Sequence, residues 1–349
     1  MEKAKIKKES KRKIRVDFER APLAERLKSK FLNTFFFKKV LFLLFKLVLL
    51  VGVSYVILYP YITKIFTSFM SLSDFDDATV ILISKNPTWD QYKYIITENQ
   101  YGKAVITSTL ISASVALVQT LVCSLVAYGL AKFKFKGNNI LFLIAILTMM
   151  IPLETLKFPI MRYFTRFHES NPIGWLLYKL GAIKKGQFLN TVWPLYIMSI
   201  TALGLKNGLF IFMLRQFFKG VPDELEESAY VDGSSTFRTF FRIIIPISVP
   251  MLITVFVFAF AWQWTDDFFI TQDAKSIFFE SSYWTKQNAL KLISHISEIP
   301  PSLKNSKVPQ YETAIRGSAS ILIVIPLMIV YLIAQNKIVE GVERSGIVG

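Results

Sequence analysis

The sequence has very few of the side chains from which disulfides and most metal sites are built. Its 349 residues include one cysteine, Cys123, and two histidines, His168 and His295. A single cysteine forms no internal disulfide and no thiolate cluster. Two histidines argue against a histidine-based metal site. We therefore expect no metal site and no cofactor in this chain.

Recognisable catalytic motifs are also missing. The sequence contains no G-x-x-x-x-G-K-[ST], so the chain has no phosphate-cradling loop of its own. It also lacks G-x-S-x-G and H-E-x-x-H, which mark serine hydrolases and zinc hydrolases. These absences predict that the chain is not an enzyme and leave a transporter subunit, a channel or a scaffold.

Apolar residues are abundant and occur in long runs. They make up 52% of the chain, with 31 Phe, and several runs are long enough to cross a bilayer. The pattern predicts an all-α membrane protein with six transmembrane helices. The expected spans are about 47–69, 104–131, 139–164 (interrupted by "MIPLE" at 150–154), within 191–214 (interrupted at Lys206–Gly208), within 243–264, and 317–336.

The formal charge of +16 is concentrated at the N-terminus, where residues 1–46 hold 15 Lys/Arg against 5 Asp/Glu. We interpret 1–46 as a basic cytosolic extension that fixes topology and contacts anionic lipid. A regulatory or nucleic-acid role of this extension is a minor alternative, and we expect no nucleic acid among the partners. An even number of spans then places both termini of a multi-pass membrane protein in the cytosol.

The remaining charges agree with this orientation at most loops. The 70–103 loop, expected outside, carries four aspartates, and the "KFKFKG" linker falls inside. The 162–190 loop disagrees, because it should lie outside yet holds five Lys/Arg against Glu169. Residues 47–349 are expected to form one transmembrane domain. Its external loop, about 265–312, is long enough for a small folded cap.

The stretch 223–250 is polar and lies between two apolar regions. Pro222 suits the first turn of a helix, Gly233 permits the turn that ends it, and Ser234 is expected to cap the next helix. Four apolar residues are then expected to form one stripe, and two prolines to bend span five; these are Phe237, Phe240, Phe241 and Ile244, then Pro246 and Pro250. The pattern predicts a cytosolic helix–turn–helix between spans four and five.

Small residues beside carboxylates on the first of these helices favour entry into a groove on a partner. An ordinary amphipathic interfacial loop is the alternative from physics alone. The order Glu227-Ser228-Ala229, Gly233, Ile243, Ile245-Pro246 resembles the "EAA" loop of the integral membrane subunits of binding-protein-dependent ABC importers. Ser228 and Ile245 depart conservatively from that pattern, which has Ala and Leu there.

Other stretches resemble the carbohydrate branch of that family, which contains the smaller maltose permease; they lie at 124–139, 148–160, 208–233 and 261–268. The resemblance implies a permease subunit of a sugar or oligosaccharide importer in the bacterial cell membrane. It also implies partners: ATPase subunits that carry ATP and Mg, a second and different permease, an extracellular solute-binding protein and membrane lipid.

By this resemblance the polar loop is a coupling helix that docks on the ATPase. Glu227 would pair with a basic residue there, Ala229 would pack in its cleft and Gly233 would set the turn. The full coupling set is Glu226, Glu227, Ser228, Ala229, Asp232, Gly233 and Pro246.

Candidates for the substrate path are polar or aromatic groups at membrane depth; these are Glu154, Asn207, Trp264 and Asp267. Each has a simpler interpretation: a solvated carboxylate, a helix break or an interfacial aromatic anchor. A self-sufficient secondary transporter or channel, or an ABC permease for a non-sugar solute, remains an alternative function.

Overall fold

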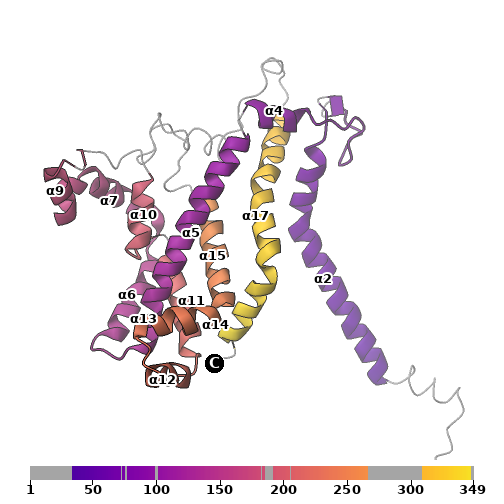
Figure 1. Cartoon of the computed structure of the whole chain (residues 1–349). Helices are drawn as coiled ribbons and strands as arrows, with labels where there is room; N and C mark the ends of the chain where they lie inside the picture. Colours follow the sequence, from indigo (N-terminus) through magenta and orange to yellow (C-terminus); the bar gives the residue numbers. More distant parts are fainter. Residues whose placement is uncertain are drawn as a thin grey trace, which may run out of the picture. The chain divides into compact units, whose positions relative to one another are not determined.

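The computed structural model describes residues 34–71, 73–74, 77–98, 101–181, 183–184, 192–204, 206–265 and 309–346. Every regular element in these ranges is helical, in line with the predicted all-α class (Figure 1). The helices are α2 (Thr34–Thr67), α4 (Asp90–Glu98), α5 (Tyr101–Lys132), α6 (Asn138–Met150), α7 (Leu153–Thr165), α8 (Phe167–Ser170), α9 (Pro172–Lys179), α10 (Trp193–Ile200), α11 (Asn207–Lys219), α12 (Glu224–Val231), α13 (Thr236–Thr239), the π-helix η1 (Phe240–Ile244), α14 (Ile245–Ile247), α15 (Val249–Trp264) and α17 (Pro309–Gly346).

Three helices in the described ranges are long and apolar enough to cross a membrane. They are α2 over Phe37–Thr67, the whole of α5, and α17 over Gly317–Gly341. A fourth span results if Thr236–Ile247 and Val249–Trp264 count as one, although they are bent by 81°. Length and composition thus support three to four spans, against the six that the sequence predicts. The first helix also begins at Thr34 rather than near residue 47.

The two remaining predicted spans are each divided into shorter helices. The third divides into α6 and α7 at Ile151 and Pro152. Both residues have an extended backbone, and Pro152 has no N–H with which to continue the hydrogen bonding of α6. The fourth divides into α10 and α11. Ala202 and Lys206 there adopt left-handed φ angles of 59° and 65°. The interruption predicted at "MIPLE" is therefore confirmed. The one predicted at Lys206–Gly208 is present but ends at Lys206, because α11 already begins at Asn207.

The chain forms two compact units, residues 1–62 and 63–349, and the core belongs to the second. There α5 packs against α10, α11 and α15, and α15 packs against α17 (Figure 1). Small buried side chains of α5, such as Ala116 and Ala127, let neighbouring backbones approach closely. Gly208 brings α11 against α6: a Cβ there would lie 2.3 Å from the carbonyl oxygen of Ala145.

A polar network joins α4 to the first part of α17. The Ser318 and Gln91 side chains hydrogen-bond at 2.7 Å, and Gln91 Nε2 donates to the Met70 carbonyl at 2.7 Å. The Tyr101 hydroxyl donates to the Leu322 carbonyl at 3.0 Å, so the first turn of α5 also reaches α17. The predicted external loop lies mostly outside the described residues, apart from Thr265 and the start of α17 from Pro309.

Candidate functional site

The polar loop folds as a short helix with defined ends. Helix α12 begins at Glu224, and three glutamates in its first turn complement the positive end of the helix dipole. It ends in a Schellman motif: the Ser234 N–H donates to the Ala229 carbonyl at 2.9 Å and the Gly233 N–H to the Tyr230 carbonyl at 3.0 Å. Gly233 has φ +75°, as the motif requires, so its predicted role in ending the helix is confirmed.

The cap of the next helix differs from the sequence prediction. Ser235, not Ser234, is the N-cap of α13, because its Oγ accepts a hydrogen bond from the Arg238 N–H at 3.4 Å. Ser234 belongs to the preceding turn, where the Schellman motif uses its N–H. Its own Oγ instead faces Thr239 Oγ1 at 3.1 Å. Ser234 and Ser235 are adjacent and both suit an N-cap, so the length of the preceding turn decides which of them caps α13.

The predicted apolar stripe after this turn is wrong at two of its four positions. Phe240 and Ile244 are buried, whereas Phe237 is 70% and Phe241 is 54% exposed. The reason is the π-helical turn η1 at Phe240–Ile244, which inserts an extra residue per turn and shifts the α-helical spacing. Beyond it, Pro246 is exposed in α14, and the predicted bend into α15 is present, at 81°.

The inward face of α12 is held by the last turn of α5. Glu226 and Ala229 are buried. The Tyr128 hydroxyl donates to Glu226 Oε2 at 3.0 Å, and Lys132 Nζ lies 3.3 Å from Glu226 Oε1. Lys132 Nζ also donates to Asp223 Oδ1 at 2.5 Å, and this contact holds the pKa of the Asp223 carboxyl below its usual range. The two anchoring residues on α5 were not predicted.

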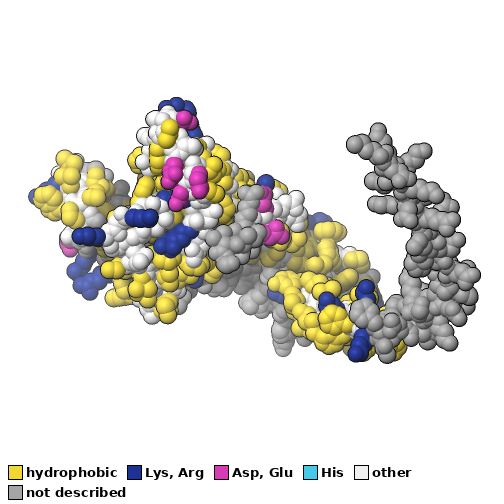
Figure 2. Space-filling model, turned by 90° about the horizontal axis from the view of Figure 1, so that it is seen from below, with side chains coloured by type: hydrophobic (Ala, Val, Ile, Leu, Met, Phe, Trp, Pro, Cys, Tyr) yellow, Lys and Arg dark blue, Asp and Glu magenta, His cyan; other side chains and the backbone are white. Residues whose placement is uncertain are grey.

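The outward face carries four residues of the predicted coupling set. Glu227, Ser228, Asp232 and Gly233 are all exposed. Seen from the end of the molecule where α12 lies, acidic side chains gather over this helix, with basic side chains beside them (Figure 2). The arrangement offers a negatively charged ridge with a small residue, Ser228, at its centre. Such a surface suits a groove lined by basic groups.

The four substrate-path candidates are in different environments. Asn207 is 1% exposed at the start of α11, and neither atom of its amide has a hydrogen-bond partner among the described residues. Trp264 is also 1% exposed; its Nε1 donates to the Ile323 carbonyl at 3.1 Å, so its environment is that of a core residue. Glu154 is in the first turn of α7, but its side chain and all of Asp267 lie outside the described residues.

Gln119 is a neighbour of Asn207 that the sequence did not single out. It is buried on α5, and a Cβ built on Gly204 would meet both Gln119 Nε2, at 2.7 Å, and Asn207 Nδ2, at 3.0 Å. The two amides therefore converge on the break between α10 and α11. The only signal of Gln119 in the sequence was an amide side chain within an uncharged predicted span.

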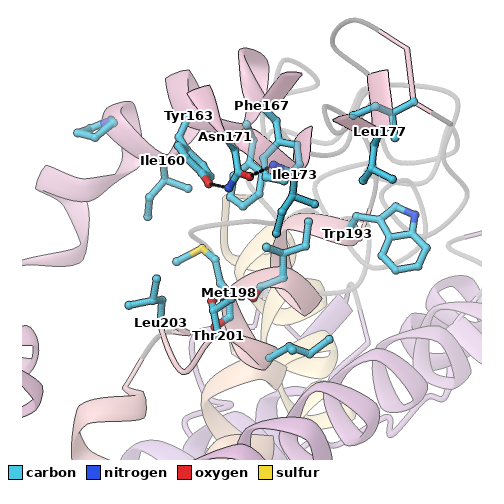
Figure 3. A pocket seen from close by; sticks show the side chains of 15 residues that line it. Ile160, Tyr163, Phe167, Asn171, Ile173, Leu177, Trp193, Met198, Thr201 and Leu203 are labelled. Atoms are coloured by element: carbon cyan, nitrogen blue, oxygen red, sulfur yellow. Dashed lines mark hydrogen bonds between the residues drawn. The ribbon is translucent and has the colours of Figure 1, made fainter. Parts of the chain in front are cut away.

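A cavity of about 960 Å³ lies between α7, α9 and α10 (Figure 3). Its described lining is chiefly aliphatic and aromatic. The Asn171 amide donates to the Tyr163 hydroxyl at 2.7 Å, and Asn171 Oδ1 caps α9 by accepting from the Ile173 N–H at 2.8 Å. These polar groups are therefore already partnered. The lining suits an apolar group better than a sugar, which needs several free hydrogen-bonding groups.

The sequence of this chain is similar to those of known transport proteins. Residues 119–344 match the family described as "Binding-protein-dependent transport system inner membrane component". The polygalacturonan/rhamnogalacturonan transport system permease protein of Bacillus subtilis is 25% identical over 293 residues, 83% of this chain and 92% of that protein. The arabinooligosaccharides transport system permease protein of Halalkalibacterium halodurans is 24% identical over 303 residues, 85% of this chain and 93% of that protein.

A solved structure shares the fold. It is a chain of a bacterial ABC transporter involved in the import of the acidic polysaccharide alginate, with a TM-score of 0.60 and 18% sequence identity. The match covers 86% of this chain and 97% of that one.

Proposed function

The chain belongs to the family of binding-protein-dependent transport system inner membrane components, and we propose that it is the permease subunit of an ATP-driven importer of sugars or oligosaccharides. The match over residues 119–344 carries this proposal, and relatives named for oligosaccharide and polysaccharide transport support the substrate class. Separate ATPase subunits would bind ATP and Mg. A second permease would complete the pathway, and a solute-binding protein would deliver the sugar.

The proposed topology has six membrane passes, with both termini in the cytosol. A 13-residue helix such as α6 spans only about 20 Å, short of the roughly 30 Å of a hydrocarbon core. We propose that α6 with α7, and α10 with α11, each make one broken pass. The basic N-terminal region and the acidic 70–103 loop support the orientation.

The proposed coupling surface is the outward face of α12. Glu227 would pair with a basic group of the ATPase, with Ser228 beside it against the cleft, and Asp232 would extend the acidic ridge. Gly233 would fix the end of the helix. Glu226 and Ala229 are buried against this chain, so we propose that they hold the helix rather than touch the ATPase. Pro246 would set the bend that leads from this surface into α15.

The polar break in the fourth pass is the proposed contribution of this chain to the substrate route. Interrupted helices place free backbone and buried amides at membrane depth in many transporters. Asn207 and Gln119 converge at such a break, and Asn207 has unpartnered polar atoms. These amides would hydrogen-bond the hydroxyl groups of a passing sugar.

The test reverses one charge on the proposed coupling surface. We expect Glu227→Lys to weaken ATPase association by about 30-fold or more, because it removes one partner of an interfacial charge pair and adds repulsion. The measurement is copurification of the ATPase, followed by sugar-stimulated ATP hydrolysis of the complex in proteoliposomes. Asp90→Lys is the matched control, since it makes the same charge change at the exposed start of α4.

Normal association and hydrolysis in Glu227→Lys would overturn the coupling role of this surface. Sugar uptake by the chain alone, driven by an ion gradient, would instead favour a self-sufficient transporter. ATP-driven uptake of a solute other than a sugar would overturn only the substrate class.

A further inference from the structure

A buried ionic contact joins α12 to a helix far from it in the sequence. The side chains of Lys132 on α5 and Glu226 on α12 are 7% and 8% exposed and lie 3.3 Å apart at their charged atoms. Tyr128, one turn earlier on α5, donates to the other oxygen of Glu226 at 3.0 Å. We name Tyr128, Lys132 and Glu226 the α5–α12 latch.

The ammonium group of Lys132 faces three oxygens of the α12 region. It donates to the Val221 carbonyl at 2.7 Å and to Asp223 Oδ1 at 2.5 Å, and the third oxygen is Glu226 Oε1. The first two contacts are hydrogen bonds to the segment before α12, and the third is an ion pair with the first turn of the helix. Lys132 therefore holds the entry into α12 at three points, at Val221, at the N-cap Asp223 and at Glu226 in the first turn.

Packing alone does not require these charges. The Tyr128 ring already contacts Phe218 and Phe240 at centroid distances of 5.9 and 4.9 Å, which gives the junction an apolar core. Burying an ion pair costs desolvation that a hydrophobic pair avoids. The charged pair adds a fixed orientation of α12 on α5, because the attraction between Lys132 and Glu226 resists rotation and sliding of α12 on the end of α5.

Helix α5 is placed to carry a displacement onward. It is a single helix of 32 residues, about 48 Å long, and it packs against α10, α11 and α15. Near its other end the Tyr101 hydroxyl donates to Leu322 on α17. The end that bears the latch is also tied to α11, since Arg215 Nε donates to the Leu130 carbonyl at 3.1 Å.

We infer that Lys132 is a positioning residue that transmits movement of α12 into α5. The inference rests on the proposed function, in which the ATPase moves α12. Along the chain α12 is connected only to α11 and α13. Lys132 connects it across 91 residues to the helix that packs against α10, α11 and α15. A displacement of α12 thereby reaches several helices of the core at once.

The experiment uses the complete transporter in proteoliposomes, with its ATPase, second permease and binding protein. Three variants are compared with the unaltered complex: Lys132→Met, Glu226→Gln and the double variant that carries both. Lys134→Met is the matched control, because Lys134 is an exposed lysine two residues further on. The readouts are thermal stability of the complex, ATPase copurification, and sugar transported per ATP hydrolysed.

We expect each single variant to lower stability. Lys132→Met leaves the buried Glu226 carboxylate without a cation, and Glu226→Gln leaves Lys132 with only the exposed Asp223 as its anionic partner. The double variant removes both charges and should regain most of that stability. Its sugar transported per ATP should nevertheless stay about fivefold or more below that of the unaltered complex. Lys134→Met should change none of the three readouts.

The outcomes separate the latch from the proposed function. Normal sugar transported per ATP in the double variant would overturn the latch and leave only a structural role for Lys132. An equal defect in Lys134→Met would also overturn it, because general loss of positive charge would then explain the result. No ATP-driven sugar uptake by the unaltered complex would instead overturn the proposed function.

Discussion

Gly233 controls the end of α12 through its backbone alone. Its φ of +75° lies in the left-handed region, and nothing lies within 4 Å of the place where a Cβ would be. A side chain at this position would therefore clash with no neighbouring residue, and its only cost would be the strain of the left-handed backbone conformation. The glycine keeps the Schellman motif intact and so fixes where the acidic ridge stops.

Replacing Gly233 with alanine should cost about 1–2 kcal/mol, the usual penalty of a left-handed conformation for a residue with a Cβ. We expect the last turn of α12 to fray and ATPase copurification to fall. The measurement is amide exchange of the 224–235 segment together with copurification. Gly102→Ala is the control: Gly102 is helical with open space around it, so its substitution should leave both unchanged. Unaltered exchange in Gly233→Ala would contradict the prediction.

At the scale of elements, Asp74 organises the segment between α2 and α4. Its carboxylate accepts hydrogen bonds from Ser84 Oγ at 2.5 Å and from the Asn86 N–H and amide at 3.1 Å each. The bond from Ser84 is the main reason that the pKa of Asp74 is held below its ordinary value of 3.8. The ionised carboxylate of Asp74 therefore holds Ser84 and Asn86 in place through these three hydrogen bonds.

A lowered pKa in the folded state means that the contribution of Asp74 is present above pH 3.8 and is lost as the pH falls through the folded value. We expect Asp74→Asn to loosen residues 84–86 at neutral pH, where the unaltered segment is intact. The unaltered segment should loosen only in acid. Hydrogen exchange corrected for intrinsic rates measures both, with Asp90→Asn as control. A segment equally protected in Asp74→Asn at pH 7 would refute the role of the carboxylate.

At the scale of the whole molecule, the proposed orientation makes a prediction about accessibility from the two sides of the membrane. Cys123 is fully buried, so replacing it with alanine gives a background without a reactive thiol. In that background, Ala78→Cys should react with a membrane-impermeant maleimide in right-side-out vesicles. Lys134→Cys should react only in inside-out vesicles. Both positions are exposed, so a failure to react reports the side and not burial. Labelling of both from one side would refute the six-pass topology.

Much of the site was predictable because its signals are local. Acidic residues before Gly233, and prolines at 246 and 250, act through their own backbone or through neighbours a few residues away. Their predicted effects, a short helix, its end and the bend beyond, are present in the structure. The sequence did not predict that Ser235 rather than Ser234 is the cap, and it did not predict the π-helical turn. Each of these differs from the prediction by a shift of one residue along the helix.

By itself the sequence determined the membrane class, the interruptions in the third and fourth apolar segments and the spacing that marks the family. Hydrophobic run length, proline chemistry and short-range spacing are all properties of the unfolded chain. Only the tertiary structure decided which face of α12 is free, that Trp264 is core, and that Lys132 and Tyr128 hold Glu226. These depend on contacts between residues 59 to 98 positions apart in the sequence, and no local pattern predicts contacts between residues so far apart.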